Sequence, residues 1–167
     1  MTERMIRQAT PEDRAAILDL NTRAFGREDE ANIIAKLEKA GDILLELVAH
    51  EDDQILGHIL FYPIGVFGRL GAMGLGPMCV DPWVQRDGIG SNLVAQGLNF
   101  VKQQGAPIVF VLGHKEYYPR FGFTEEATAE FQTPLKGPHF MGIRFRFGPP
   151  MSGRLIFPDA FGIADLA

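Results

Sequence analysis

The stretch that decides the fold is "LGPMCVDPWVQRDGIGSNLV", which runs from Leu75 to Val94. It begins as an apolar run, passes through a polar turn with two glycines, and continues with apolar residues at helical spacing. A strand, a turn and a helix in this order are typical of an α/β chain. The first N–H groups of a helix have no partner inside it, and glycines let a ligand approach the backbone closely. The turn from Gln85 to Ser91 is therefore either an anion site or a simple connection.

Several features of this turn favour a phosphate. The dipole of a helix attracts anions to its N-terminal end, and Arg86 and the Ser91 hydroxyl add donors. Two other phosphate motifs fit poorly: a dinucleotide fingerprint requires a third glycine where Leu93 stands, and a nucleoside triphosphate loop requires a lysine that this turn lacks. A Gly-x-Gly pattern alone is more often a structural turn than a phosphate site.

The residues before this stretch predict a strand and two helices. "MIRQAT" at residues 5–10 is expected to form a strand that ends at Thr10, a good helix N-cap directly before Pro11. Apolar residues at helical spacing follow. "REDEANIIAKLEKAG" predicts a second helix, which Gly41 would end.

Three strands are expected next. "ILLELVAHED" and "QILGHILFYPIGV" predict a hairpin with a tight turn at residues 52–53, and "GRLGA" at residues 68–72 predicts a second turn. "MGLGPMCV" at residues 73–80 then forms a strand that contains Pro77. A proline lacks the N–H that a sheet ladder needs, so Pro77 predicts a bulge or a strand that leaves its neighbour.

The residues after the glycine turn complete a mixed α/β layer fold. They predict a helix over 88–104, a strand "PIVFVLG" buried on both faces, a short helix in "KEYYPRFGF" with a turn into a strand, and a late strand "HFMGIRFRF". The tail after residue 153 is apolar and irregular. The 167 residues contain no internal repeat and no linker, so a single domain over 1–167 is expected.

Composition narrows the class of protein. The net charge of −5 argues against broad binding to nucleic acid, which requires a basic face. The single cysteine, Cys79, excludes an intrachain disulfide. No apolar run approaches the roughly 20 residues that span a bilayer, and the N-terminus is polar. We therefore expect a soluble cytoplasmic protein that binds neither nucleic acid nor a membrane.

The glycine turn resembles the signature of the GNAT superfamily of N-acetyltransferases. The core of that signature is Gln/Arg-x-x-Gly-x-Gly/Ala, which Gln85, Gly88 and Gly90 match. The predicted order of elements also resembles the GNAT fold, from the first strand through the late strand.

A second motif strengthens the resemblance. "VLGHKEYYPRFGF" is similar to the Tyr-x-x-x-Gly-Phe segment of the family, with Tyr118, Gly122 and Phe123 at the matching positions. Together, "LGPMCV", "QRDGIG" and "YYPRFGF" look most like the YhbS-like branch of predicted N-acetyltransferases. The resemblance implies the acyl-CoA N-acyltransferase fold, an α/β arrangement with a mixed, mostly antiparallel sheet, splayed central strands and flanking helices.

The resemblance also implies acetyl-CoA as the co-substrate and no metal. In this family the turn binds the pyrophosphate, and the pantetheine arm pairs with the first of two splayed strands, here near Met78 and Val80. The residues expected to bind acetyl-CoA are Met78, Cys79, Val80, Gln85, Arg86, Asp87, Gly88, Ile89, Gly90 and Ser91.

The implied reaction is acyl transfer to an amine. Tyr118 matches the position of the family's general acid, which protonates the leaving thiolate, and its neighbour Tyr117 is the alternative. A tyrosine with a pKa of about 10 is protonated at neutral pH. Backbone amides near Val80 are expected to polarise the thioester carbonyl.

The base that deprotonates the amine stays unassigned. "MGLGPMCV" offers no carboxylate where many family members carry a glutamate. Glu46, His58, His114 and Glu116 are substitutes, although each is more often a structural or solvated residue. Cys79 lies inside a strand without an adjacent base, so it is expected to be a small buried apolar residue and not a nucleophile.

The acceptor is also open. Acidic residues 28–30 either attract a cationic amine or form a solvated helix face. Three aromatic residues either line an acceptor pocket or belong to the core: Tyr62, Phe67 and Phe140.

Three functions therefore compete. The leading hypothesis is an acetyl-CoA-dependent N-acetyltransferase that acts on a primary amine of a small molecule or a protein. The alternative is a non-catalytic acyl-CoA-binding or regulatory module, which the missing carboxylate favours. A structural protein without a co-substrate is the third. The apolar tail and the late strand are candidates for a homodimer interface.

Overall fold

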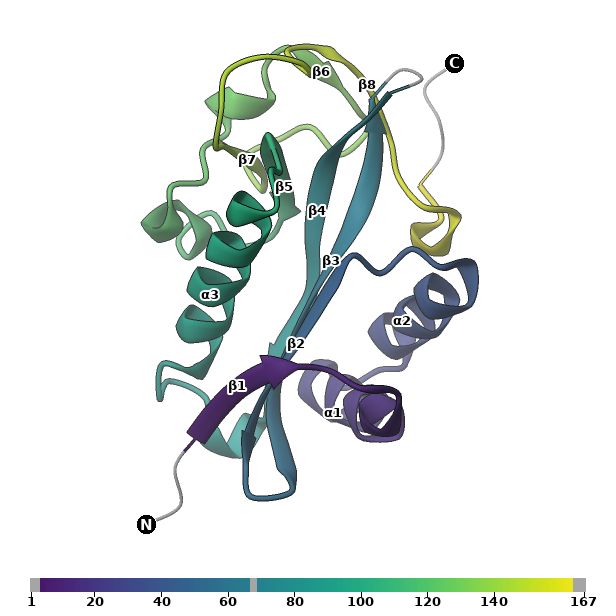
Figure 1. The fold of residues 1–167 in the computed structure, drawn as a ribbon, viewed down its shortest axis with the longest axis vertical. Coiled ribbons are helices and arrows are strands. Elements are labelled where there is room, and N and C mark those ends of the chain that lie inside the picture. Colours follow the sequence, from purple (N-terminus) through teal and green to yellow (C-terminus); the bar gives the residue numbers. More distant parts are fainter. Residues whose placement is uncertain (1–3, 67–68, 164–167) are drawn as a thin grey trace. The chain divides into compact units, whose positions relative to one another are not determined.

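A computed structural model describes residues 4–66 and 69–163 of the chain (Figure 1). The chain forms two compact units, one from residues 1–60 and 77–99 and the other from residues 61–76 and 100–167. Three elements run through both units: β3 (Gln54–Val66), β4 (Arg69–Val80) and α3 (Ile89–Gln103). The division therefore assigns no domains, and a single domain over 1–167 stays a prediction.

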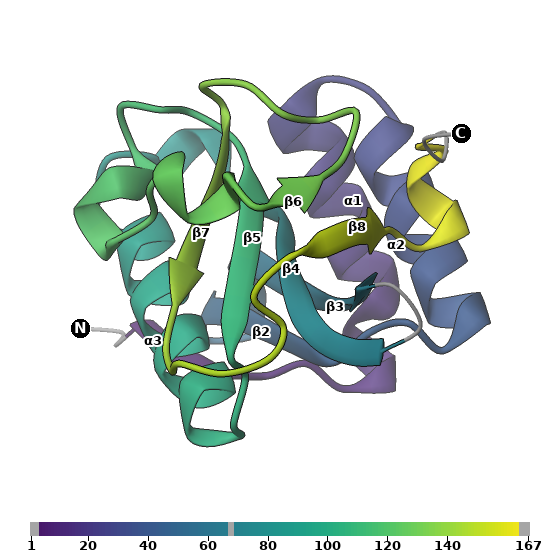
Figure 2. The ribbon, with the colours of Figure 1, turned by 90° about the horizontal axis from the view of Figure 1, so that it is seen from above.

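In the first unit the strands follow the order β1-β2-β3-β4. β1 (Arg4–Gln8) pairs antiparallel with β2 (Leu45–Glu51). The helices α1 (Arg14–Phe25) and α2 (Asp29–Ala40) lie side by side, as Figures 1 and 2 show. Each ends at a glycine in the left-handed conformation, Gly26 and Gly41 respectively.

Different helices cover the two faces of β3 in this unit. A Cβ placed on Gly57 would lie 2.8 Å from Leu93 Cδ1 and 2.9 Å from Ile89 Cγ2, so α3 packs directly against the strand there. The next residue, His58, points the other way, and its Nδ1 lies 3.2 Å from Nδ2 of Asn21 on α1. Because side chains alternate across a strand, α3 covers one face and α1 the other.

In the second unit the strand order is β3-β4-β5-β7. β5 (Ile108–Leu112) is parallel to β4 and antiparallel to β7 (Phe140–Arg144), as Figure 2 shows. β8 (Gly153–Ile156) pairs with β6 (Phe131–Gln132) and with the end of β3. The mixed, mostly antiparallel sheet with flanking helices confirms the predicted fold class.

The parallel pairing of β4 with β5 stops abruptly. The described register ends at Leu75 opposite Val111, and Gly76 follows with a φ of +131°. Only glycine adopts such a φ without strain. This end of the ladder agrees with the expectation that the strand leaves its neighbour near Pro77.

Aromatic side chains form the core of the second unit. The ring of Phe110 stacks on Phe140 at 5.5 Å and meets Phe131 edge-on at 5.0 Å between centroids. Phe157, which follows β8, lies 6.4 Å from Phe140. Phe157 therefore joins this core from the segment that follows β8.

Two sequence expectations need correction. Residues 69–72 belong to β4 instead of forming a turn, because pairing with β5 begins at Ala72 opposite Ile108 and the strand extends back to Arg69. Residue 68 of the expected turn lies outside the described residues. The late strand ends at Arg144, because the guanidinium of Arg144 donates to the Pro150 carbonyl at 2.9 Å and the Phe145 N–H turns to the Pro107 carbonyl.

Among the described residues, short 3-10 turns precede α1, lie between the later elements and follow β8: Pro11–Asp13, Pro82–Val84, Tyr118–Phe121, Glu126–Thr128 and Asp159–Phe161. In the described part of the chain, no helix combines the length and the apolar character needed to cross a bilayer.

Candidate functional site

Asp81 fixes the start of the glycine turn. Its N–H donates to the Leu56 carbonyl at 2.7 Å, and its carboxylate accepts hydrogen bonds from the Trp83 N–H and the Arg23 guanidinium, both at 2.9 Å. Burial raises the pKa of Asp81, but these hydrogen bonds outweigh burial and hold the pKa below its usual range. The turn is therefore tied to β3 and to α1.

The backbone of the turn is strained. Arg86 has a φ of +74° and Gly88 a φ of +84°. A non-glycine residue in the left-handed region costs roughly 1–2 kcal/mol, and such strain clusters at functional sites. The first hydrogen bond of α3 runs from the Asn92 N–H to the Gly88 carbonyl. The strained turn thus directly precedes the positive end of the helix dipole, where an anion is favoured.

Some side chains around the turn form hydrogen bonds within the protein, and others are exposed to solvent. Gln85 donates to the Val80 carbonyl at 3.1 Å, so its side chain closes the turn. Asp87 pairs with Arg4 at 3.1 Å, which offsets a negative charge beside a candidate anion site. Arg86 is exposed, while Ile89 is buried and anchors the helix start.

The residues of β4 before the turn differ in burial, and the buried position of Cys79 confirms the prediction that it is a small core residue. Met78 and Val80 are half-buried, and Cys79 is buried. Burial raises the pKa of the Cys79 thiol to about 12, so the thiol stays protonated at neutral pH. A protonated, buried thiol is a poor nucleophile. Gly90 and Ser91 lie half-buried in the first turn of α3.

Tyr118 lies in the second unit, deep among other rings. It opens a 3-10 turn that ends at Gly122, whose φ is +104°, and only 7% of Tyr118 is exposed. Its ring meets Tyr117 and Phe123 edge-on at 5.1 and 5.7 Å between centroids. Burial, with a smaller contribution from Tyr117, raises the pKa of Tyr118 to about 12. The phenol therefore keeps its proton at any physiological pH.

Tyr117 is in a shallower position than Tyr118. It is half-buried, and the Arg120 guanidinium lies over its ring at 4.5 Å. Its ring also meets Phe121 edge-on. Both tyrosines thus pack, but Tyr118 is the more desolvated of the two.

Two of the four base candidates form one buried network in the first unit. His58 is fully buried, and its Nε2 lies 2.7 Å from the Glu46 carboxylate, which also accepts two hydrogen bonds from Arg14 at 2.8 and 2.9 Å. Burial raises the pKa of Glu46, but the hydrogen bonds from His58 and Arg14 outweigh it and lower the pKa. Glu46, His58 and Arg14 are therefore hydrogen-bonded to one another, which favours a structural role over the role of catalytic base. His114 and Glu116 are exposed.

The acceptor candidates lie in different places. Glu30 accepts two hydrogen bonds from Arg27, which hold its pKa below the usual value, and Glu28 and Asp29 are exposed. Tyr62 and Phe140 belong to the second unit, and Phe67 lies outside the described residues.

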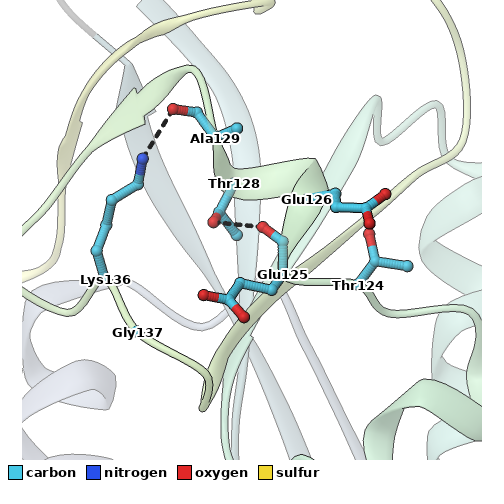
Figure 3. A pocket seen from close by; sticks show the side chains of 7 residues that line it. All are labelled: Thr124, Glu125, Glu126, Thr128, Ala129, Lys136 and Gly137. Carbon is cyan, nitrogen blue, oxygen red and sulfur yellow. Dashed lines mark hydrogen bonds between the residues drawn. The ribbon is translucent and has the colours of Figure 1, made fainter.

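An open surface pocket lies in the second unit, and the residues that line it follow β5 in the sequence (Figure 3). Its Lys136 ammonium donates to the Ala129 carbonyl at 2.8 Å, and its Thr128 hydroxyl donates to the Glu125 carbonyl. None of the residues predicted from sequence lines it. The lining residues are Thr124, Glu125, Glu126, Thr128, Ala129, Lys136 and Gly137.

Sequence reasoning missed three supporting residues. Gly113 lies under the Tyr118 ring, Gly57 lies under α3, and the Asn21 amide faces His58. Gly113 carried a faint signal, since it interrupts an apolar strand just before the tyrosine motif. Among the described residues, no cluster of three or more His, Cys, Asp or Glu side chains suits a metal ion, and the expected lack of a metal stays a prediction.

Comparison with known proteins identifies the family. The model of the acetyltransferase (GNAT) domain matches residues 5–125, and the chain therefore belongs to the GNAT family of N-acetyltransferases. Both sequence motifs lie inside this range.

Relatives agree with this assignment. The chain is 36% identical over 116 residues to an uncharacterised N-acetyltransferase, YjhQ, of Escherichia coli strain K12, covering 66% of this chain and 64% of the relative. It is 35% identical over 121 residues to another, YhbS of the same strain, covering 71% and 72%. The chain thus spans just under two thirds of the length of YjhQ.

Solved structures extend the likeness to nearly the full chain. A GNAT acetyltransferase from Brucella melitensis in complex with acetyl-CoA matches with a TM-score of 0.83 and 34% identity, covering 95% of this chain and 98% of the other. E. coli YhbS in complex with CoA matches with a TM-score of 0.89 and 28% identity, covering 97% and 93%. The predicted resemblance to the YhbS-like branch is confirmed.

Proposed function

We propose that this protein is an acetyl-CoA-dependent N-acetyltransferase that acts on a primary amine of a small molecule or a protein. One observation carries the proposal: the strained turn with Arg86 and Gly88 at positive φ opens a helix in a GNAT chain. Relatives of this chain have been solved with acetyl-CoA and with CoA. The proposed co-substrate is therefore acetyl-CoA.

The turn would hold the pyrophosphate. Backbone amides from Gln85 to Ser91 and the exposed Arg86 guanidinium provide the donors. The half-buried residues Met78 and Val80 would pair with the pantetheine arm through their backbone groups.

The reaction balances without a metal or a redox partner. The neutral amine nitrogen attacks the acetyl carbonyl carbon, the C–N bond forms, and the C–S bond of the thioester breaks. The amine loses one proton to solvent, and the departing sulfur gains one from Tyr118, which is then reprotonated by solvent. The main-chain amide near Val80 would stabilise the oxyanion.

The raised pKa refines the role of Tyr118. At about 12 it keeps the phenol protonated, but it also makes the phenol a weaker acid than a thiol, whose pKa is about 8.5. Full proton transfer to the thiolate is thus uphill in the ligand-free environment. A hydrogen bond that strengthens as charge develops on sulfur would provide most of the benefit, with the proton following.

Calorimetry tests the binding site. Titration with acetyl-CoA should give saturable binding for the wild type and none for Gly90→Glu, because a carboxylate would occupy the phosphate position. Gln96→Glu is the matched control, since it adds the same charge to an exposed position further along α3. Equal binding by all three proteins would refute the assigned turn.

Turnover tests the proposed acid. With an amine panel and detection of free CoA thiol, Tyr118→Phe should lower turnover roughly ten- to a thousandfold and spare acetyl-CoA binding. Tyr117→Phe shows whether the neighbour shares the role. Unchanged turnover in Tyr118→Phe would remove the role assigned to this phenol.

A non-catalytic acyl-CoA-binding module is the second candidate. Two observations favour it, because each removes a candidate for the catalytic base. β4 carries no carboxylate from Arg69 to Val80, and the buried side chains of Glu46 and His58 are hydrogen-bonded to each other. Saturable acetyl-CoA binding without CoA release over the whole amine panel would establish this alternative. A cytoplasmic location and a homodimer stay predictions.

A further inference from the structure

The ring of Tyr62 lies directly against the main chain of β4. A Cβ placed on Gly74 would lie 2.1 Å from Tyr62 Cζ and 2.4 Å from its hydroxyl oxygen. No side chain fits in that space, so the glycine is what lets the phenol, hydroxyl included, rest on the strand. Only 7% of Tyr62 is exposed.

The hydroxyl of Tyr62 has no hydrogen-bond partner among the described residues. Tyr62 makes ring contacts with Phe157 and Phe161, and within the described part of the chain its hydroxyl makes no hydrogen bond. Burial raises the pKa of Tyr62 well above its usual value, so the group is a neutral donor and acceptor. The hydroxyl oxygen is not one of the fully buried side-chain atoms that lack a hydrogen-bond partner in the described residues, so it keeps some contact with solvent. A hydroxyl that makes no hydrogen bond inside the protein contributes no hydrogen-bond energy to its stability, and phenylalanine would fill the same space. The hydroxyl can therefore form a hydrogen bond to a ligand without breaking one inside the protein.

The position of this hydroxyl along the sheet is specific. Gly74 lies one residue before Leu75, where the pairing of β4 with β5 ends opposite Val111. The Tyr118 ring lies over Gly113, two residues beyond Val111. Within the second unit, the buried rings of Tyr62 and Tyr118 thus each cover a glycine near the end of the β4–β5 pairing, Gly74 on β4 and Gly113 just after β5.

The C-terminal segment surrounds Tyr62 with aromatic rings. β8 pairs with β3 at Gly65 opposite Ile156, which brings the following residues back along β3. The rings of Phe161 and Phe157 then lie 4.4 and 6.3 Å from the Tyr62 ring. Both phenylalanines are only half-buried, so they leave apolar surface beside the phenol.

We propose that Tyr62, Phe157 and Phe161 form the acceptor subsite, and that the acceptor is a primary amine carried on an aromatic or apolar body. The Tyr62 hydroxyl accepts a hydrogen bond from the amine, and the two phenylalanines pack against the body. This inference rests on the proposed acetyl transfer.

The chemistry of the segment sets the substrate class. Residues 156–162 contain one carboxylate, Asp159, and it is exposed. A polyamine carries several charges and would need several carboxylates to replace its hydration. In the other unit, Glu30 is committed to Arg27. Aromatic rings, not acids, are the groups that the subsite offers.

Kinetics with two probe amines test the class. At saturating acetyl-CoA, the wild type should release CoA faster with 2-phenylethylamine than with spermidine. Tyr62→Phe keeps the ring and removes the hydroxyl, and Phe161→Leu removes part of the rim. Each should raise KM for 2-phenylethylamine about five- to tenfold, the worth of one hydrogen bond or contact, and leave acetyl-CoA affinity unchanged. Phe147→Leu, at a 92% exposed position outside the subsite, is the control and should change nothing.

A second measurement does not depend on turnover. Because the hydroxyl makes no hydrogen bond within the described part of the chain, Tyr62→Phe should melt at about the same temperature as the wild type. A clearly lower Tm would show a structural partner and overturn the inference. CoA release with spermidine but not with 2-phenylethylamine would overturn the substrate class, as would an unchanged KM in Tyr62→Phe. Acetyl-CoA binding with no turnover on any amine would instead contradict the proposed function, and it would remove the substrate class with it.

Discussion

The ring of Tyr118 lies over Gly113 so closely that a Cβ on Gly113 would be 2.3 Å from Tyr118 Cε2. Two hydrogen bonds with His139 hold this glycine in place. Its N–H donates to the His139 carbonyl at 2.9 Å, and Nδ1–H of His139 donates back to the Gly113 carbonyl at 3.1 Å. The main chain at Gly113 cannot move easily, so the Tyr118 ring can lie there only because Gly113 has no side chain.

Gly113→Ala should therefore displace Tyr118. Steady-state CoA release should fall about ten- to a hundredfold, because an ångström-scale shift of a reacting group has that effect. Overpacking should also lower the free energy of unfolding by about 1–3 kcal/mol.

Gly142→Ala separates these two effects. A Cβ at that position would crowd Phe110 and Ala127 at 3.3–3.4 Å, away from the Tyr118 ring. It should cost stability and keep turnover. If Gly113→Ala and Gly142→Ala lose turnover equally, the glycine has no special role in placing the phenol.

The buried phenol also makes stability depend on alkaline pH. The pKa of Tyr118 is raised to about 12, above its unfolded value of about 10. Its contribution is present in full below pH 10 and is lost as pH rises through 12, since the unfolded chain ionises first. Between these values the free energy of unfolding should fall by about 1.4 kcal/mol per pH unit for this group.

Urea unfolding at pH 9 and pH 11 measures that dependence. Tyr118→Phe should show a shallower loss than the wild type over this interval. Tyr62 also has a raised pKa, so some loss should remain in the variant. Identical slopes for the two proteins would mean that Tyr118 is not desolvated in solution.

The strain at Arg86 gives a third expectation. Arg86→Gly and Arg86→Ala both remove the guanidinium, but only glycine relaxes the φ of +74°. The glycine variant should be about 1 kcal/mol more stable than the alanine variant in urea unfolding. Both should bind acetyl-CoA more weakly than the wild type, because a donor to the anion is lost. Equal stability of the two variants would argue against backbone strain in the turn.

Local patterns predicted the elements that frame the proposed site. The stretch from Leu75 to Val94 encodes the end of β4, the turn and the start of α3, and the helix begins at Ile89, one residue after the predicted start. Hydrophobic periodicity and glycine positions are local signals, so sequence alone was sufficient there.

The missed features depend on contacts between distant residues. Asn21 and His58 meet although they are 37 positions apart. The sequence of the tail shows no regular hydrophobic pattern, because β8 is only four residues long. Its strand structure depends on pairing with β3 and β6. Similarly, nothing near Tyr62 in the sequence indicates that its ring covers Gly74. Register and packing, not propensity, decide these positions.

The network of Arg14, Glu46 and His58 should contribute mainly to stability. Glu46→Gln keeps the shape but leaves the Arg14 charge with only the half-exposed Glu38 carboxylate, and Arg14→Met leaves the Glu46 charge with only His58. Each single change should lower the free energy of unfolding by about 1–3 kcal/mol, because a buried or half-buried charge loses its main hydrogen-bond partner. The double variant should lose less than the sum, since both charges are then gone.

The pH dependence of this network has the opposite sign to that of Tyr118. The pKa of Glu46 is below its usual value of 4.5, so its contribution is present at neutral pH and is lost as pH falls below about 5 toward the folded pKa. Wild type and Glu46→Gln should therefore differ in urea midpoint at pH 7, and the difference should shrink as pH falls through the folded pKa of Glu46. If acetyl transfer disappears in Glu46→Gln while its midpoint at pH 7 equals that of the wild type, the carboxylate acts in catalysis and the structural role is wrong.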